Sequence, residues 1–353
     1  MIDVAVVGGS GYTGVELIRL LLNHPKVNLK SVTSRSENGR PLTSYFPSFI
    51  GHPQAESLVF SLPELELLTK HDLVFFATPN GTAMKLVPGL LAAGVKVIDL
   101  AADFRLKDAQ EWSEWYGIDH AAPELLAEAV YGLADLYPEA VTGSNLVANP
   151  GCFPTAVQLV LKPLIECGLI NTESSIIADC KSGVSGAGRS GKVGHSFAEV
   201  AENFQAYGVE GHRHWPEIHQ GLGGSNRVKD FTFIPHLVPM SRGIFATIYA
   251  DFSTSHSQNA AQAVIAARQV LKETYTNSPF VFLLHEGEVP QTKSVRCSNK
   301  CYINVFQAAS GKLVLTAAID NLVKGAAGQA VQNMNLMLGF PTEEGIQSLG
   351  ITP

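Results

Sequence analysis

Apolar residues in the first 150 positions come in short runs that alternate with segments of helical spacing. Ile2–Val7 is an apolar, β-branched run, which is typical of a strand buried on both faces. Helical spacing follows at residues 15–22, and Asn23-His24-Pro25 ends that segment. Further strands are predicted at Val27–Thr33, 73–77 and 95–100, and a further helix at 82–93. This alternation predicts a parallel sheet with helices on both faces.

The pattern of apolar positions changes near Asn149. Longer runs, rich in β-branched and aromatic residues and partly alternating, lie at residues 175–180, 229–234 and 243–252. Partial alternation is typical of antiparallel strands that bury one face of their sheet. Helical spacing returns at residues 260–275 and 326–338. The change predicts a second domain with a different architecture.

A glycine-rich turn joins the first strand to the first helix. Residues 8–14 read GGSGYTG, with G-x-x-G-x-x-G in place of the commoner G-x-G-x-x-G. Glycines let a backbone approach a pyrophosphate, and the following helix offers N–H groups and the positive end of its dipole. We therefore predict an α/β fold with a Rossmann dinucleotide-binding domain, followed by an α+β catalytic domain with a mainly antiparallel sheet.

Composition narrows the class of protein. The chain has 353 residues, of which 46% are hydrophobic and 16% are charged. Its length suits two domains, and its hydrophobic residues are numerous enough to fill two cores. Its formal net charge of −7 leaves no excess of Lys and Arg for a nucleic acid, so no such partner is expected. No membrane is expected either, because no apolar run approaches the roughly 18 residues of a span. The N-terminus lacks the basic segment of a signal peptide, so the expected location is cytoplasmic.

Cys152 is the candidate nucleophile among five cysteines, whose odd number argues against a disulfide framework. The turn signal ANPG precedes it, a helical pattern follows it, and Pro154 suits the first turn of a helix. A helix N-terminus stabilises a thiolate through its N–H groups and its dipole. The alternative is a small buried cysteine, as Cys167 and Cys180 are expected to be.

Two histidines flank an arginine in the segment GHRHWPEI at residues 211–218. Imidazole titrates in the range that acid/base work on a thiol intermediate requires, and spacing alone does not choose between His212 and His214. No metal site is expected. Cys297 and Cys301 lie four positions apart, but no nearby His or Cys pair completes a ligand set.

The end of the second strand bears on the cofactor. NAD enzymes usually place an Asp or Glu there to bind the ribose 2′-hydroxyl. Here Ser34 and Arg35 occupy the position, and no acid appears before Glu37. A hydroxyl and a guanidinium suit a 2′-phosphate, so we predict NADP(H), with an ordinary solvated arginine as the alternative.

A second glycine-rich segment offers a competing function. Residues 186–192, GAGRSGK, fit G-x-x-x-x-G-K, but a P-loop then requires Ser or Thr, and the next residue is Val193. The loop can still bind a phosphate through backbone N–H groups, with Arg189 or Lys192 adding charge. A P-loop phosphotransferase is therefore disfavoured, and a non-enzymatic dinucleotide-sensing module is the other alternative.

Seven segments together resemble one family, the N-acetyl-gamma-glutamyl-phosphate reductases of arginine biosynthesis in their longer bacterial form. They follow the family's order over nearly the whole chain, and NPGC with HRHxPEI is far more specific than the glycine turn. The segments are GGSGYTG at 8–14, ADFR at 102–105, ANPGCFPT at 148–155, SGVSGAGR at 182–189, GHRHWPEI at 211–218, PMSRGI at 239–244 and NLVKGAAGQA at 321–330. Aspartate-semialdehyde dehydrogenases are related, and glyceraldehyde-3-phosphate dehydrogenase shares the two-domain plan.

The resemblance implies roles for the matching positions. Cys152 would be the nucleophile and His212 the acid/base. Substrate-binding positions would be Arg105, Asn149, Tyr207 and His214. The NADP site would be lined by Gly8, Ser10, Gly11, Tyr12, Thr13, Gly14, Ser34, Arg35, Ser182, Gly183 and Asn321.

The resemblance also implies an organisation and a reaction. An NADP-binding domain would span residues 1–148, a C-terminal helix at about 326–353 would return to it, and residues 149–325 would form a catalytic and dimerisation domain of a homodimer or homotetramer. NADPH would reduce N-acetyl-L-glutamyl 5-phosphate to N-acetyl-L-glutamate 5-semialdehyde through a Cys152 thioester. The alternative is a related reductase acting on an aminoadipyl or aspartyl phosphate.

Overall fold

The computed structural model describes residues 1–189, 193–253 and 260–351. It divides into two compact units, Met1–Pro150 with Ala326–Gln347, and Gly151–Gly325 with Ser348–Pro353. Residues 348–351 therefore group with the second unit. The sequence had instead predicted that the whole segment 326–353 returns to the first unit. The cause is local pairing within the second unit. The Ile351 amide donates to the Arg296 carbonyl, and the Arg296 side chain donates to the Ile351 carbonyl.

The first unit contains a parallel sheet in the order β3-β2-β1-β4-β5-β7-β6. Its strands are β1 (Ile2–Val7), β2 (Val27–Thr33), β3 (Phe60–Ser61), β4 (Leu73–Phe76), β5 (Lys96–Asp99), β6 (Val130–Tyr131) and β7 (Leu146–Ala148). The strand order changes direction between β1 and β4, so the carboxyl ends of these two strands border the crevice where such sheets bind ligands.

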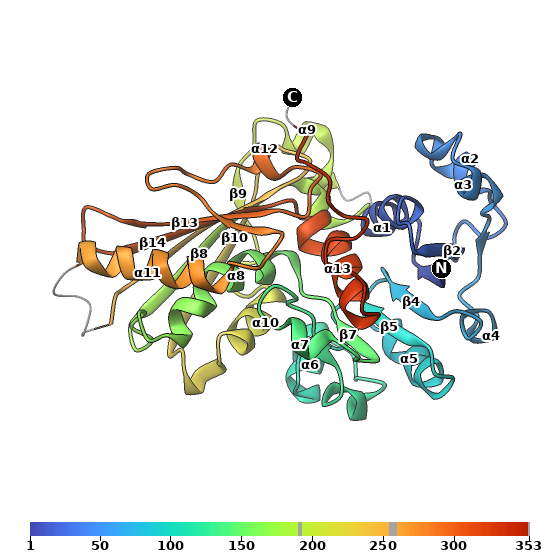
Figure 1. The fold of residues 1–353 in the computed structure, drawn as a ribbon, viewed down its shortest axis with the longest axis horizontal. Coiled ribbons are helices and arrows are strands. Elements are labelled where there is room, and N and C mark those ends of the chain that lie inside the picture. The colour runs from blue at the N-terminus through green and yellow to red at the C-terminus, as the bar shows by residue number, and fades with distance from the viewer. Residues whose placement is uncertain (190–192, 254–259, 352–353) are drawn as a thin grey trace. The chain divides into compact units, whose positions relative to one another are not determined.

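Helices cover both faces of this sheet, which explains its continuous apolar strands. Helices α1 (Tyr12–Leu22) and α13 (Gly328–Met337) lie together on one face, and α5 (Ala83–Ala92) packs on the other (Figure 1). All four residues of β4 are buried as a result. The remaining helices of this unit are α2 (Leu42–Tyr45), α3 (Pro53–Ser57), α4 (Leu65–Leu68), α6 (Ala109–Tyr116) and α7 (Pro138–Val141).

The second unit contains a mixed sheet in the order β12-β13-β14-β11-β8-β10-β9. Its strands are β8 (Ser175–Ser182), β9 (Gln205–Ala206), β10 (Asp230–Leu237), β11 (Ile244–Ala250), β12 (Val281–Leu283), β13 (Cys301–Gln307) and β14 (Leu313–Ile319). The β8–β10 and β12–β13 pairs are parallel, and the other described pairs are antiparallel. The predicted fold class, with a mainly antiparallel second sheet, is therefore confirmed.

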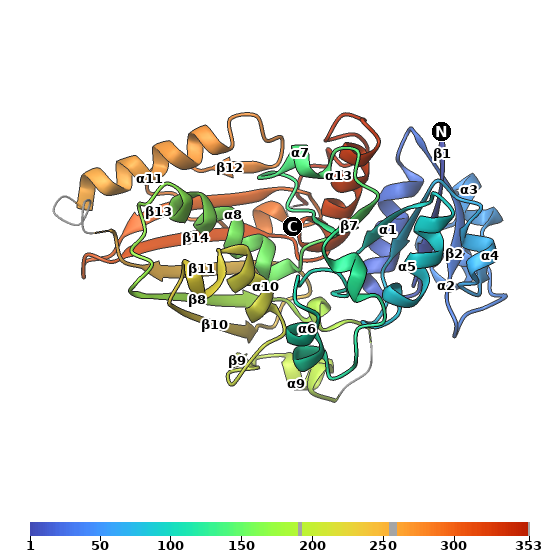
Figure 2. The ribbon, with the colours of Figure 1, turned by 90° about the horizontal axis from the view of Figure 1, so that it is seen from below.

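The two faces of the second sheet differ. Helices α8 (Cys152–Glu166) and α11 (Ala260–Thr274) pack on one face (Figure 2), and α10 (His214–Gly221) packs against α8. Side chains alternate along β11, so Ile248 is buried while Tyr249 stays partly exposed. Register places Ile177, Tyr249 and Val314 in one row of the other, partly exposed face. Shorter α-helices among the described residues of this unit are α9 (Phe197–Val200) and α12 (Thr292–Val295).

The last predicted helix begins differently from the expected span 326–338. A π-helical turn, Val323–Ala327, comes before α13, and the Gly325 amide donates to the Asp320 carbonyl five residues earlier. A wider turn of this kind often occurs at functional sites. In the described ranges, no helix combines the length and the apolar character that a membrane crossing requires.

Substitution of Gly14 by Ala is expected to destabilise the first unit. A Cβ on Gly14 would lie 2.4 Å from the Gly8 carbonyl oxygen and 2.8 Å from the Gly9 Cα, which are backbone atoms that cannot rotate away. We expect a loss of about 1–3 kcal/mol in the free energy of unfolding. Gly11→Ala is the matched control, because its Cβ would meet only the Gly8 oxygen at 3.9 Å. Equal melting temperatures of the two ligand-free variants by circular dichroism would contradict this steric explanation.

Candidate active site

Cys152 is the first residue of α8, which begins directly after the turn that follows β7. Gly151, the N-cap, has extended backbone angles, and the Thr155 amide donates to its carbonyl. Pro154 carries no N–H, and a helix offers no internal acceptor to the amides of its first residues. The half-buried thiol therefore lies at the positive end of a fifteen-residue helix.

Gly325 packs directly against the nucleophile candidate. A Cβ on Gly325 would lie 2.7 Å from the Cys152 Cβ and 3.1 Å from its Cα. Gly325 belongs to the π-helical turn after β14, within the segment NLVKGAAGQA. Glycine at this position thus lets the end of β14 approach the start of α8 without displacing the thiol.

One cavity of about 520 Å³ in the second unit brings together most of the predicted site residues of that unit. It is lined by the predicted Cys152, Ser182, Gly183, Tyr207, His212 and His214. The lining residues not predicted for the site are Phe153, Gly186, Ala187, Gly194, His195, Gln205, Gly211, Arg213 and Leu237. Cys152 and His212, about 60 positions apart in the chain, therefore share one cavity.

The His212 ring has a defined protonation state. Its Nδ1 accepts a hydrogen bond from the His214 backbone amide at 3.1 Å. Burial, with a further contribution from the positive charge of Arg213, lowers the pKa of His212 to about 4. The imidazole is therefore neutral near pH 7, and its proton resides on Nε2. Of the two ring nitrogens, Nε2 is the one that can donate to a bound molecule.

Aromatic rings surround the two histidines. The Phe153 ring contacts His212 and His214 edge-on, at centroid distances of 5.9 and 5.8 Å. Tyr207 packs on His212 at 5.5 Å. Burial raises the pKa of Tyr207 above its usual range, so the hydroxyl stays protonated and can donate a hydrogen bond.

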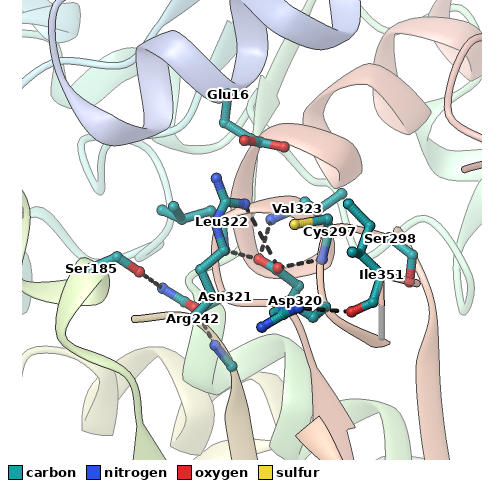
Figure 3. Close-up of polar contacts among 12 residues, drawn as sticks. Glu16, Ser185, Arg242, Cys297, Ser298, Asp320, Asn321, Leu322, Val323 and Ile351 are labelled. Atoms are coloured by element: carbon teal, nitrogen blue, oxygen red, sulfur yellow. Dashed lines mark hydrogen bonds and ion pairs between the residues drawn. The ribbon is translucent and has the colours of Figure 1, made fainter. Parts of the chain in front are cut away.

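Asn321 supports the cavity without lining it. Its side-chain amide donates to the Ser185 hydroxyl at 3.0 Å and accepts from the Gly243 amide at 2.7 Å (Figure 3). The neighbouring Asp320 carboxylate accepts the amides of Leu322 and Cys297. Asn321 thereby joins the loop after β8, which carries Gly183, to the segment that begins β11.

The predicted residues of the dinucleotide turn lie in the first unit, where Gly8, Ser10 and Gly11 fall between β1 and α1, and Tyr12, Thr13 and Gly14 form the start of α1. The Ser10 and Ser34 hydroxyls are 2.9 Å apart, and Ser36 lies 3.3 Å from Ser34. Arg35 is exposed beside them at the carboxyl end of β2. Gly8 has a positive φ of 87°, a conformation that glycine adopts readily. The turn, Ser34 and Arg35 therefore meet at one edge of the sheet.

Arg105 and Asn149 also belong to the first unit and bind each other. The Arg105 Nε donates to the Asn149 carbonyl at 2.8 Å, and its terminal nitrogen donates to the Leu100 carbonyl. The Asn149 side chain is buried, donates to the Ala326 carbonyl and accepts from Asn333. These contacts hold the chain three residues before Cys152.

A pair of buried carboxylates shapes the loop that carries Arg105. Asp99 accepts the amides of Ala101 and Asp103, and Asp103 accepts those of Gly81 and Met84 at the start of α5. Burial raises the pKa of both groups, and the neighbouring charge of Asp103 adds to the rise at Asp99. The motif ADFR thus has a structural role in addition to supplying the arginine.

Several functional candidates escaped the sequence reasoning. Glu217 is buried and accepts a hydrogen bond from the Gly151 amide at 2.7 Å. It belongs to the segment HWPEI, but the sequence alone did not single it out. Arg213 and Gly325 likewise belong to the segments GHRHWPEI and NLVKGAAGQA but were not predicted as site residues. Ser190, Gly191 and Lys192 of the P-loop-like segment lie outside the described residues. Among the described residues, no cluster of three His, Cys, Asp or Glu side chains could hold a metal ion.

Comparison with known proteins covers both units. Residues 3–144 match the semialdehyde dehydrogenase NAD-binding domain, and residues 152–321 match the semialdehyde dehydrogenase dimerisation domain, which indicates a homo-oligomer. N-acetyl-gamma-glutamyl-phosphate reductases from Nitrosomonas eutropha and Thiobacillus denitrificans are each 51% identical, over 100% of both chains.

A solved structure supports the same fold. The aspartate semialdehyde dehydrogenase from Candida albicans, determined with NADP, aligns with a TM-score of 0.69 at 16% identity, covering 95% of this chain and 98% of that one. The fold, the two matched domains and the full-length identity agree with the resemblance carried by NPGC and HRHxPEI. The chain belongs to the N-acetyl-gamma-glutamyl-phosphate reductases, within the semialdehyde dehydrogenase family.

Proposed function

We propose that this chain reduces N-acetyl-L-glutamyl 5-phosphate to N-acetyl-L-glutamate 5-semialdehyde in arginine biosynthesis, using NADPH and a thioester on Cys152. The observation that carries the proposal is the placement of Cys152 at the N-terminus of α8, in one cavity with His212. Membership of the reductase family supplies the substrate.

Cys152 would open the reaction. Its thiolate, stabilised at the helix N-terminus, attacks the acyl carbon and forms the C–S bond. The amides at the start of α8 stabilise the oxyanion, and inorganic phosphate leaves with the electrons of the broken C–O bond. A thioester on Cys152 remains. A serine in this place would leave an ester, which resists hydride far more.

His212 would act mainly as a donor. Because its Nδ1 is held by the His214 amide, the Nε2–H can stabilise the oxyanion of the acylation step and of the later thiohemiacetal. The thiohemiacetal then collapses, the C–S bond breaks, and the aldehyde leaves. Acceptance of the thiol proton by His212 would require the other tautomer. The Tyr207 hydroxyl, also protonated, is a second donor in the cavity.

The substrate is anionic at both ends, so cationic and donor side chains are required. Arg213 and His214 line the cavity and suit one anionic end. Arg105 would bind the other anionic end of the substrate, as the resemblance implies. Aminoadipyl and aspartyl phosphates have the same reacting group, and steady-state rates on the three acyl phosphates decide between them. Preference for either analogue would replace the proposed substrate and leave the covalent chemistry intact.

The first unit would hold NADP(H). The Gly14–Gly8 contact leaves no room for a Cβ, so the start of α1 lies close against the turn whose backbone would bind a pyrophosphate. The Ser34 hydroxyl and the exposed Arg35 would bind a 2′-phosphate, and no carboxylate precedes Glu37 at that edge. When bound, the reduced nicotinamide supplies the hydride that converts the thioester to the thiohemiacetal. In the second unit, Ser182 and Gly183 would contact the cofactor, and Asn321 would hold their loop.

The partly exposed face of the second sheet supports self-association as a homodimer, or as a homotetramer built from it. Ile177, with 38% of its surface exposed, lies beside Tyr249, and Tyr249 lies beside Val314. A β-branched and aromatic row on a sheet face resembles half of a packed core. This face lies within residues 152–321, the part that matches a dimerisation domain.

Cys152→Ser is expected to lower turnover by at least about three orders of magnitude, because the thioester path disappears. NADPH binding, measured by fluorescence, should persist. Cys167→Ser is the control, because this exposed cysteine lies at the other end of α8. Near-normal turnover of the Cys152 variant would refute the covalent mechanism.

Arg35→Ala is expected to raise the Kd of NADPH about tenfold or more, and that of NADH by less than about twofold, since only NADPH loses a charge-assisted hydrogen bond. Arg40→Ala is the control, because its guanidinium already binds Glu37 and the Ser44 carbonyl. Equal losses for both nucleotides, measured by titration calorimetry, would assign Arg35 no part in 2′-phosphate recognition.

Ile177→Asp is expected to convert the oligomer to a smaller species, because an interface core does not accept an unpaired carboxylate. Ile265→Asp on α11 serves as the comparison, as its side chain is 65% exposed and lies on the helical side of the sheet. Light scattering after size exclusion gives the mass. An unchanged mass for the Ile177 variant would show that the interface lies on another face of the protein.

A further inference from the structure

Two helices of the second unit are joined by hydrogen bonds along one face of α8. The Gly151 amide donates to the Glu217 carboxylate at 2.7 Å, and the Gln158 side chain donates to the Glu217 carbonyl at 3.1 Å. Farther along α8, the Lys162 ammonium donates to the Gly221 carbonyl at 2.5 Å. Positions 151, 158 and 162 recur on one side of a helix, so these bonds fix α10 against α8 in one register.

The packing at this contact is close. Gln158 and Glu217 are 0% and 1% exposed. A Cβ on Gly221 would lie 2.3 Å from the Gln158 side-chain nitrogen, so glycine leaves the space that this buried side chain occupies between the helices. A shift of α10 would therefore break buried hydrogen bonds as well as packing, which makes the register a well-determined feature of this unit.

Glu217 connects the two halves of the proposed catalytic pair. Its carboxylate accepts the amide of Gly151, the residue directly before Cys152. Glu217 lies in α10, which begins at His214. The His214 amide donates a hydrogen bond to the Nδ1 of His212. One side chain thus joins the segment that carries the nucleophile to the segment that carries the histidines.

The Gly151 amide depends on an acceptor. Gly151 is buried and is the extended N-cap of α8, so its amide lies outside the hydrogen bonds of the helix. An unsatisfied buried amide is costly, and the chain relieves such a cost by shifting its backbone. Here that shift would act on the residue adjacent to the thiol.

We propose that Glu217 is a positioning residue for the reaction, acting through Gly151 to fix the place of Cys152 relative to His212. For this role, residue 217 needs a side chain long enough for its oxygen to accept a hydrogen bond from the Gly151 amide. The proposal rests on the proposed function for its kinetic consequence, but its effect on the Cys152 thiol can be measured without any substrate. A displacement of about 1 Å between reacting groups can lower turnover about a hundredfold.

The test compares Glu217→Ala with Glu217→Gln in the full-length protein. Both variants remove the carboxylate charge, and only the glutamine keeps an oxygen acceptor for Gly151. We expect kcat of Glu217→Ala to fall about 10- to 100-fold below that of Glu217→Gln, with KM changed less than about threefold. Alkylation of Cys152 by iodoacetamide at pH 7, followed by mass spectrometry, should be at least about threefold slower in Glu217→Ala, because the start of α8 no longer holds the thiolate in place.

Lys162→Ala is the structural control, because it removes a bond of the same helix pair ten residues from the thiol. It should lower the melting temperature and leave alkylation unchanged. If Glu217→Ala does not fold, Glu217→Asp replaces it, since the shorter side chain withdraws the acceptor. Equal alkylation rates and equal kcat in the alanine and glutamine variants would overturn the proposal. Absence of reductase activity in the unmodified protein would instead refute the proposed function, while the alkylation comparison would still test Glu217.

Discussion

Helix α8 begins at Cys152, and the chemistry proposed for the site depends on where that helix begins. An extended Gly151 ends the turn after β7, and Pro154 occupies the first helical turn without needing a hydrogen-bond acceptor. A start one residue later would place the sulfur outside the first turn, where the dipole and the amide groups act most strongly. The local sequence ANPGCFPT therefore determines both a boundary of secondary structure and a chemical property of one side chain.

The surroundings of the thiol come from distant parts of the chain. Gly325 reaches Cys152 because β14 ends there and a π-helical turn widens the backbone. His212 enters the same cavity on the segment before α10, and α10 is held to α8 by buried polar contacts. These elements meet because strands of one sheet end near one another and a helix packs across them. Small residues at 221 and 325 allow the close approaches.

Sequence reasoning succeeded where the information was local. Periodicity predicted the alternation of β1, α1 and β2, and the turn before Cys152 distinguished this cysteine from the other four. It failed where the choice depended on partners far away in the chain. Even at short range, His212 and His214 have equivalent sequence signals, and their rings differ in the folded structure, where the His214 amide donates to the His212 Nδ1. Glu217 is a case of long separation, because its partner Gly151 is 66 positions away. Asn321 was predicted through the family resemblance, and its partners Ser185 and Gly243 are 136 and 78 positions away. No periodic pattern encodes such a separation.

The cavity gathers hydrogen-bond donors although the whole chain is acidic. Each step of the proposed reaction places negative charge there, first on the Cys152 sulfur, then on the acyl oxygen, and finally on the thiohemiacetal. A neutral His212 with its proton on Nε2, a protonated Tyr207 and the amides of α8 can all donate to that charge without changing protonation state. A carboxylate facing the same oxygen would oppose it. Glu217, close in sequence to both histidines, instead has a carboxylate oxygen bound to the Gly151 amide on a buried helix contact. The same residue therefore fixes the nucleophile's segment while adding no charged side chain to the lining of the cavity.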